Sequence, residues 1–311
     1  MNIAFFTEAG IKRGMGHLVR SYTIAQKFKD NSCAVDFFLD SDIDFAYKFD
    51  ELKQFSWDTF KIEKKYDVIF IDSYEATLAH YQEAVNNSKI AVFLDDENRL
   101  SYPKGVIINF APDANKVFFP TKQKENTYLL GLDYIPIRKE FIEAYKEKKE
   151  SIFIMLGGAD TNCLSYDIIE LLQDIDVKKI IVTNDTKMKE KLEKFAKVKV
   201  LYRPNDDELI KIMTQSSIAI STASMTIYEL AYLQIPTISI SVNTNQHNGA
   251  SQLIKYNITK ANISIEESNW KNKLYKELQH LIQNKNAFQT NNKIDGLGTQ
   301  RIFDSISRLI Q

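Results

Sequence analysis

The feature that most constrains the fold is an alternation of short apolar segments with stretches of helical periodicity, which begins at the first residues. In the first half, the apolar segments of strand length are residues 2–7, 34–39, 68–71, 90–94 and 106–109. Residues 17–29 and 78–85 lie between such segments and carry apolar side chains at helical spacing. Strands that alternate with helices in this way predict a parallel sheet with helices on its faces.

The alternation stops at a charged run, residues 144–150, and then starts again. A run of this composition is typical of a solvated linker. Beyond it, further strands are predicted at 152–156, 180–183, 198–202, 218–221 and 237–241, with helices at 187–196, 206–215 and 226–233. We therefore expect two doubly wound, Rossmann-like α/β domains, residues 1–146 and 151–311, with a cleft between them. A last helix is expected from Thr299. Its docking is left open, with the N-terminal domain as one candidate.

Charge and cysteine content exclude several classes of protein. The 40 basic and 41 acidic residues leave a formal net charge of −1, so no overall basic field attracts nucleic acid. No stretch reaches the ~20 apolar residues that a membrane span needs, and the N-terminus has no basic leader. Cys33 and Cys163 lie far apart without a CxxC partner, which fits a reducing compartment. We expect a cytoplasmic protein without nucleic-acid or membrane partners, and the oligomeric state stays open.

A glycine-bearing loop joins the first predicted strand to its helix. It reads Arg13-Gly14-Met15-Gly16-His17, with Arg20 one turn further on. Unpaired N–H groups and the helix dipole at such a place favour an anionic ligand, and glycine lets the backbone approach it. A histidine there can move a proton. The alternative interpretation is that His17 only caps the helix or fills the loop.

The second domain has comparable loops. Gly157 and Gly158 again follow a strand, so the two glycine loops predict a site between the domains. Ser224, Met225 and Thr226 lead from another strand into a helix, and hydroxyls and amides at a helix start suit a diphosphate. Glu229, one turn in, has the chemistry to accept two hydrogen bonds from a ribose diol. The spacing fits equally well an ordinary helix glutamate that interacts with the dipole.

Two nucleotide motifs and a metal site are excluded. A dinucleotide fingerprint needs glycine at position 19, where valine stands, and no GxxxxGK[ST] sequence occurs. The acidic pairs Asp40/Asp42 and Asp95/Asp96 are interpreted as helix caps or solvated loop residues rather than ligands of magnesium. We therefore predict no cofactor and no metal.

Taken as a set, these motifs resemble a known family. The resemblance spans nearly the whole chain and is carried by the Gly-Met-Gly-His loop with Arg20, residues 71–74, Asp95-Asp96, residues 130–141, Leu156–Asp160, the Tyr-Glu-Leu-Ala segment at 228–231, Asn245-Gln246 and residues 295–298. The set is similar to the nucleotide-sugar hydrolases of pseudaminic acid biosynthesis, which release a diacetamido-trideoxy-altrose from UDP. That family is related to the spore-coat polysaccharide proteins and to glycosyltransferases of the GT-B fold.

The resemblance implies a metal-independent, inverting hydrolase whose substrates are a UDP-linked amino sugar and water. It implies that His17 is the catalytic base, that Tyr74 lies close to the reacting sugar, and that Glu229 holds the uridine ribose. Asn245 and Gln246 join the substrate-binding set. The chain departs from the family pattern in the segment Thr7-Glu8-Ala9-Gly10, where relatives often have Arg-x-Asp, and at Ser73, which replaces a frequent histidine. Both departures concern the identity of the sugar.

Two other functions fit the same motifs. A GT-B glycosyltransferase that uses a UDP-amino sugar donor has the same donor site and differs only in its acceptor. Association with a membrane would favour a lipid acceptor. A binding module for nucleotide sugars would bind the ligand without turnover.

Overall fold

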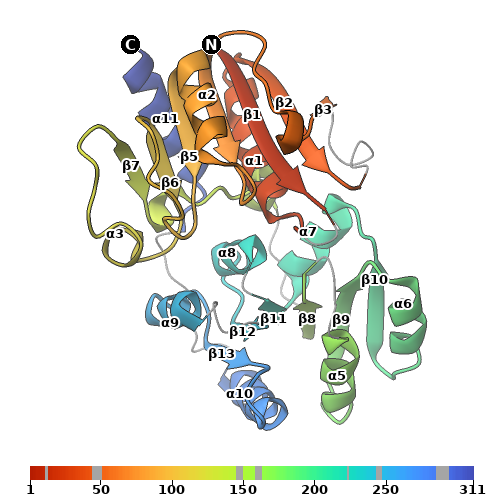
Figure 1. Cartoon of the computed structure of the whole chain (residues 1–311). Helices are drawn as coiled ribbons and strands as arrows, with labels where there is room; N and C mark the ends of the chain where they lie inside the picture. The colour runs from red at the N-terminus through yellow and green to blue at the C-terminus, as the bar shows by residue number, and fades with distance from the viewer. Residues whose placement is uncertain are drawn as a thin grey trace. The chain divides into compact units, whose positions relative to one another are not determined.

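The computed structural model describes residues 1–10, 13–43, 51–144, 150–157, 163–222, 224–242, 247–284 and 294–311. The chain divides into two compact units (Figure 1), of which the first comprises residues 1–137 and 295–311 and the second residues 138–294. The division falls at Ile137, earlier in the chain than the charged run that the sequence suggested as the linker. The last helix belongs to the first unit.

The first unit is built on a seven-stranded parallel sheet in the order β3-β2-β1-β4-β5-β6-β7. Its strands are β1 Asn2–Ala9, β2 Ala34–Ser41, β3 Leu52–Gln54, β4 Tyr66–Asp72, β5 Ser88–Leu94, β6 Val106–Asn109 and β7 Thr127–Leu130. Five of them lie on the predicted strands, whereas the short β3 and β7 had not been predicted. The predicted parallel sheet is confirmed.

Both faces of this sheet are covered because the apolar side chains of β1 alternate between them. The helices of the unit are α1 Gly16–Asp30, α2 Leu78–Asn87, α3 Ala114–Val117 and α11 Gly298–Ile310, with the 3-10 turns η1 Trp57–Thr59 and η2 Leu132–Tyr134. Ala4 and Phe6 share a buried cluster with Tyr81 of α2. On the other face, Phe5 contacts Phe28 of α1, which in turn contacts Phe303 of α11. In Figure 1, α11 (blue) lies against this unit.

The second unit repeats the architecture with a six-stranded parallel sheet in the order β10-β9-β8-β11-β12-β13. Its strands are β8 Ser151–Met155, β9 Lys178–Thr183, β10 Val198–Tyr202, β11 Ile218–Thr222, β12 Thr237–Ser241 and β13 Ala261–Ser264. Its helices are α4 Lys139–Glu143, α5 Leu164–Leu171, α6 Thr186–Leu192, α7 Asp206–Gln215, α8 Met225–Tyr232, α9 His247–Lys255 and α10 Trp270–Asn284. Of these, β13, α4 and α10 had not been predicted.

Local sequence explains where these helices begin and which side they bury. Asn205 caps α7 by accepting a hydrogen bond from the backbone N–H of Glu208, and Asp185 caps α6 in the same way. In α10 the buried residues Leu274, Leu278 and Leu281 follow helical spacing and join the core of the second sheet. None of the helices in the described ranges is long and apolar enough to cross a membrane.

The strand orders fix where ligands are expected to bind. In each sheet the order reverses once, between β1 and β4 in the first unit and between β8 and β11 in the second. Open α/β sheets bind ligands beyond the carboxyl ends of the strands at such a switch point. The glycine loop with His17 follows β1, Tyr74 follows β4, Gly157 follows β8, and Ser224 follows β11. Most of the predicted site residues thus lie at the two switch points.

Candidate active site

The loop before α1 presents an accessible backbone. Gly10 and Gly14 exchange two backbone hydrogen bonds, at 3.0 and 2.8 Å, and Gly14 has a φ of +71°, in the left-handed region that favours glycine. No heavy atom lies within 4 Å of the position a Cβ would take at Gly14 or Gly16. The side chain of Met15, which precedes the helix, makes no capping hydrogen bond. The N–H groups at the start of α1 are therefore without a side-chain cap.

His17, the second residue of α1, lies against the end of β4. Its Nδ1 is 2.9 Å from Oδ1 of Asp72, and both side chains are buried. The geometry is that of an ion-pair contact rather than a well-aligned hydrogen bond. Asp72 also accepts hydrogen bonds from Ser21 Oγ at 2.8 Å and from the guanidinium of Arg20 at 2.6 and 2.8 Å. A carboxylate on Nδ1 leaves Nε2 as the ring atom that can accept a proton from a substrate or water.

The charges around this pair set its protonation. Burial opposes the charged form of Asp72, but the positive charges of Arg20 and His17 outweigh burial and hold the pKa of Asp72 below its usual range. Burial likewise opposes the imidazolium, but the polar contact with Asp72 and the negative charges of Asp72 and Asp96 together outweigh burial, so the pKa of His17 is raised above 6.5. Asp72 is therefore a permanent anion that favours a proton on His17.

Arg20 connects this pair to Tyr74. Its Nη1 donates to both carboxylate oxygens of Asp96 at 2.8 Å, and Asp96 accepts a further hydrogen bond from Tyr74 Oη at 3.0 Å. The ring of Tyr74 meets that of His17 edge to face, with centroids 4.6 Å apart. The structure thus brings together the two residues that were predicted to be catalytic.

Two arginines were predicted to bind substrate, and the structure engages both with carboxylates. The guanidinium of Arg20 is buried between Asp72 and Asp96. Arg13 pairs with Asp40 at 3.0 Å and with Glu75 at 3.3 Å at a more open place. A substrate contact by either arginine stays a prediction, and for Arg20 the geometry favours a different role, which is to hold Asp72 and Asp96 in place.

The switch point of the second unit carries neutral polar groups. Gly157 is exposed and has a φ of +88°, so a side chain there would be strained. Ser224 immediately precedes α8 and makes no side-chain capping bond. Met225 and Thr226 form the first turn of that helix. This arrangement suits an anion held by backbone N–H groups and hydroxyls.

Glu229 lies in the same helix but is buried at 3% exposure rather than open to solvent. Both of its carboxylate oxygens accept hydrogen bonds from Arg138, at 2.7 and 3.1 Å. Nη1 of Arg138 also lies 3.1 Å from Oδ1 of Asp206 in α7. Glu229 is therefore not a solvated dipole partner. Each oxygen keeps a further lone pair, so the predicted ribose contact stays a prediction.

Three predicted residues, Gly158, Asn245 and Gln246, lie outside the described residues. The expectation that the loops of the two units line one shared cleft also stays a prediction. The sequence had placed Asp72, Asp96 and Arg138 only within segments of the resemblance, without a role. Glu8 had been noted only as one residue of the segment 7–10 that departs from the family pattern. The signal that could have found these two carboxylates was their position, since Glu8 lies near the end of β1 and Asp72 ends the neighbouring strand β4, at the switch point.

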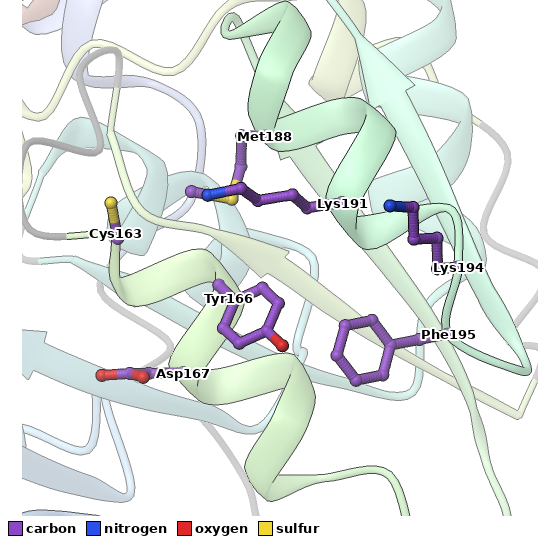
Figure 2. A pocket seen from close by; sticks show the side chains of 7 residues that line it. All are labelled: Cys163, Tyr166, Asp167, Met188, Lys191, Lys194 and Phe195. Atoms are coloured by element: carbon purple, nitrogen blue, oxygen red, sulfur yellow. The ribbon is translucent and has the colours of Figure 1, made fainter.

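A separate pocket of about 420 Å³ lies in the second unit (Figure 2). It is lined by Cys163, Tyr166, Asp167, Met188, Lys191, Lys194 and Phe195. None of these lining residues is a histidine, and its one carboxylate, Asp167, lies 3.2 Å from Lys271. This pocket therefore lacks the paired acid and base of the His17 site. Across the ranges that the structure describes, no group of three or more His, Cys, Asp or Glu side chains is placed to hold a metal ion.

The family of the chain follows from its second half. Residues 151–307, just over half of the chain, match the model of the glycosyltransferase family 28 C-terminal domain. The chain belongs to this family. The matched range covers the second sheet and most of α11.

Curated relatives confirm the resemblance seen in the sequence. The UDP-2,4-diacetamido-2,4,6-trideoxy-beta-L-altropyranose hydrolase of Campylobacter jejuni is 26% identical over 281 residues, which cover 82% of this chain and 97% of the relative. The spore coat polysaccharide biosynthesis protein SpsG of Bacillus subtilis is 24% identical over 268 residues, which cover 78% of this chain and 77% of the relative. Protein MJ1062 of Methanocaldococcus jannaschii is 24% identical over 290 residues. That match covers 82% of this chain but only 58% of the relative, so the chain spans less than two thirds of its length.

Solved structures show the fold. MnaA of S. aureus in a co-structure with UDP has a TM-score of 0.71 at 10% identity, and covers 99% of this chain and 96% of its own. MurG of Acinetobacter baumannii has a TM-score of 0.63 at 12% identity, and the match covers 99% of this chain and 100% of the MurG chain. The two parallel α/β units of this family member therefore have the GT-B fold, as the resemblance implied.

Proposed function

We propose that this chain is a UDP-sugar-processing enzyme that hydrolyses a UDP-linked diacetamido-trideoxy sugar to UDP and the free sugar. Two relatives support this assignment by name. One is the Campylobacter jejuni hydrolase. The other is a Helicobacter pylori protein named as both a pseudaminic acid cytidylyltransferase and the same hydrolase, which is 27% identical over 186 residues. The product would serve the synthesis of a nonulosonic acid such as pseudaminic acid. The proposed setting is the cytoplasm.

The observation that carries the proposal is the contact between His17 and Asp72 at the switch point of the first sheet. A buried carboxylate on one ring nitrogen orients an imidazole and stabilises its charged form, which is what a general base needs. The uncapped N–H groups at the start of α1 lie beside this base. Tyr74, whose ring contacts His17, is proposed to lie against the reacting sugar.

The proposed reaction is a single displacement at the anomeric carbon. The oxygen of a water molecule forms a bond to that carbon while His17 Nε2 takes one of its protons. The bond between the anomeric carbon and the UDP oxygen breaks, and UDP leaves with the electron pair. Attack from the opposite side inverts the anomeric configuration. The diphosphate is a stable anion, so one base suffices where ordinary glycosidases use two carboxylates.

The second unit is proposed to hold the nucleotide. Backbone N–H groups and hydroxyls around Ser224 and Thr226 at the start of α8 would bind the diphosphate, and the loop at Gly157 would approach it. Glu229, held by Arg138, would accept hydrogen bonds from the ribose. Turnover is proposed to need no metal, and it should continue in excess EDTA. Loss of activity that added magnesium restores would contradict this part of the proposal.

A glycosyltransferase is the second candidate, because the matched family model carries that name. The two functions differ in the acceptor. Purified protein incubated with a panel of UDP-diacetamido-trideoxy sugars in buffer alone should release UDP and the free sugar in equal amounts. Release of UDP only after an acceptor is added, with transfer of the sugar to it, would identify a transferase.

A further inference from the structure

Glu8 is a buried carboxylate that the proposed reaction leaves unused. It stands near the carboxyl end of β1, next to the strand that ends in Asp72, and is 2% exposed. A buried charge is costly unless hydrogen bonds satisfy it, so its partners indicate what it does.

Its hydrogen bonds lead to the loop that carries Tyr74. Oε1 accepts the backbone N–H of Tyr74 at 2.9 Å, and Oε2 accepts the hydroxyl of Ser73 and the indole N–H of Trp57, the latter at 2.9 Å. All three donors are neutral, and two of them belong to consecutive residues of one loop. Hydrogen bonds to a charged acceptor are the stronger kind. Glu8 therefore ties the start of this loop to the end of β1.

Arg99 holds the same loop by donating hydrogen bonds to the backbone carbonyl groups of the loop. Nη2 of Arg99 donates to the carbonyl oxygens of Ser73 at 3.1 Å and Ala76 at 2.9 Å. The Ser73 hydroxyl in turn accepts the N–H groups of Glu75 and Ala76, both at 2.9 Å. Most of the backbone polar groups between residues 73 and 76 thus have a partner, and Glu8 supplies the one for Tyr74.

The side chain that this loop presents is itself exposed. Tyr74 is 48% exposed, and the contacts of its side chain are the edge-to-face packing on His17 and the hydrogen bond to Asp96. These two contacts hold the ring beside His17 only while the backbone that carries it stays in place, and loop backbone moves unless it is anchored. The position of the Tyr74 ring beside the imidazole therefore depends on the anchor beneath it.

We infer that Glu8 is a positioning residue that fixes the Tyr74 loop and so holds the Tyr74 ring beside His17. The kinetic consequence of this inference rests on the proposed hydrolase function, whereas the structural part does not. Glutamine at position 8 offers one acceptor oxygen and one amide in place of two acceptor oxygens, so it cannot accept all three hydrogen bonds.

Amide hydrogen exchange tests the structural part without any substrate. In Glu8→Gln, the amides of residues 74–76 should exchange about tenfold faster than in the parent protein, because their anchor is lost. Glu83→Gln is the matched control: Glu83 of α2 also accepts a backbone N–H, that of Ile62 at 2.6 Å, but does not contact this loop. Unchanged exchange at residues 74–76 in Glu8→Gln, or equal acceleration in the control, would overturn the inference. If Glu8→Gln does not fold, Glu8→Asp, whose carboxylate is one methylene short of the Tyr74 N–H, is measured in its place with the same criteria.

A double-mutant cycle tests the kinetic part. Glu8→Gln should lower kcat about tenfold in the parent protein but have little further effect in a Tyr74→Ala background, because Glu8 acts through Tyr74. The pH at which turnover is half-maximal should not move, since Asp72 remains beside His17. Additive losses, or a shifted pH profile, would contradict positioning through Tyr74. If the parent protein turns over no UDP-sugar, the proposed function fails, and the exchange experiment alone decides the role of Glu8.

Discussion

At the strand-order reversal of the first sheet, β1 and β4 bring two buried carboxylates to the edge, Glu8 and Asp72. The corresponding reversal of the second sheet, between β8 and β11, is followed by Gly157 and Ser224 instead. Within the described part of this region, the buried carboxylate is that of Glu229, which Arg138 neutralises, and Arg138 also lies near Asp206. The two edges share one topology but differ in electrostatics. The fold supplies the place, whereas the side chains at the strand ends decide which chemistry it supports.

The difference suggests a division of labour. Buried charges that hold an imidazole in one orientation suit a step in which a proton moves. Glycine and hydroxyl groups at a helix start suit a diphosphate that must be held without being altered. We therefore expect substitutions at the first edge to affect turnover and substitutions at the second to affect nucleotide affinity.

The largest expected effect comes from His17→Ala. Removal of a general base should lower turnover by a factor on the order of 10²–10⁴, while the affinity for UDP stays near that of the parent. UDP release and calorimetric titration with UDP measure the two quantities on the same preparation. Near-normal turnover would remove His17 as the base, and a large loss of UDP affinity would break the division between the two edges.

The next effect is expected at the second edge. Glu229→Ala should weaken UDP binding by about 1.5–3 kcal/mol, the range for a hydrogen bond that involves a charged group, as measured by calorimetry. The variant also removes the buried carboxylate partner of Arg138 and leaves Asp206 as its ion-pair partner within the described ranges, so thermal unfolding should be recorded in parallel. Asp206→Asn removes the other contact of Arg138 and should leave UDP affinity nearly unchanged. Equal UDP affinity in Glu229→Ala and the parent would contradict the ribose assignment.

The smallest effect is a displacement along the pH axis. The pKa of His17 is raised by Asp72, so turnover by the neutral imidazole should be half-maximal above pH 6.5 and should rise with pH through that point. In Asp72→Asn the charge that raises this pKa is gone, and the half-maximal pH should move to a lower value. Asp67→Asn at the other end of β4 is the control, because Asp67 pairs with Lys89 instead. An equal shift of the half-maximal pH in both variants would contradict the claim that the contact with Asp72 sets the pKa of His17.

The fold was predictable to the extent that local pattern determines it. Helix α7 and strands β6, β10 and β12 lie where apolar periodicity placed them, because each buries a regular face. Strand β3 is three residues long and includes Lys53, so it carries too little pattern to be recognised. Strands β7 and β13 are as short as β6, but Thr127 in β7 and Asn262 and Ser264 in β13 interrupt the apolar run that made β6 recognisable.

The site was predictable only in part, because its contacts join residues far apart in the chain. His17 was recognised from the loop before it. Its partner Asp72 is 55 positions further along and meets it only because β4 pairs with β1. Glu8 reaches Tyr74 across the same strand pair. Such contacts depend on strand order, which the alternation of strands and helices does not specify by itself.

Hydrolysis in water enriched in oxygen-18 tests the central claim most directly, since it reports which bond the water attacks. The purified protein is given a UDP-diacetamido-trideoxy sugar in labelled water, with no other acceptor, and the released UDP is analysed by mass spectrometry. Attack at the anomeric carbon predicts that UDP is released without oxygen-18 and that the label enters the sugar. Oxygen-18 in UDP would place the attack at phosphorus, and no release of UDP in water alone would show that the enzyme is not a hydrolase of these sugars.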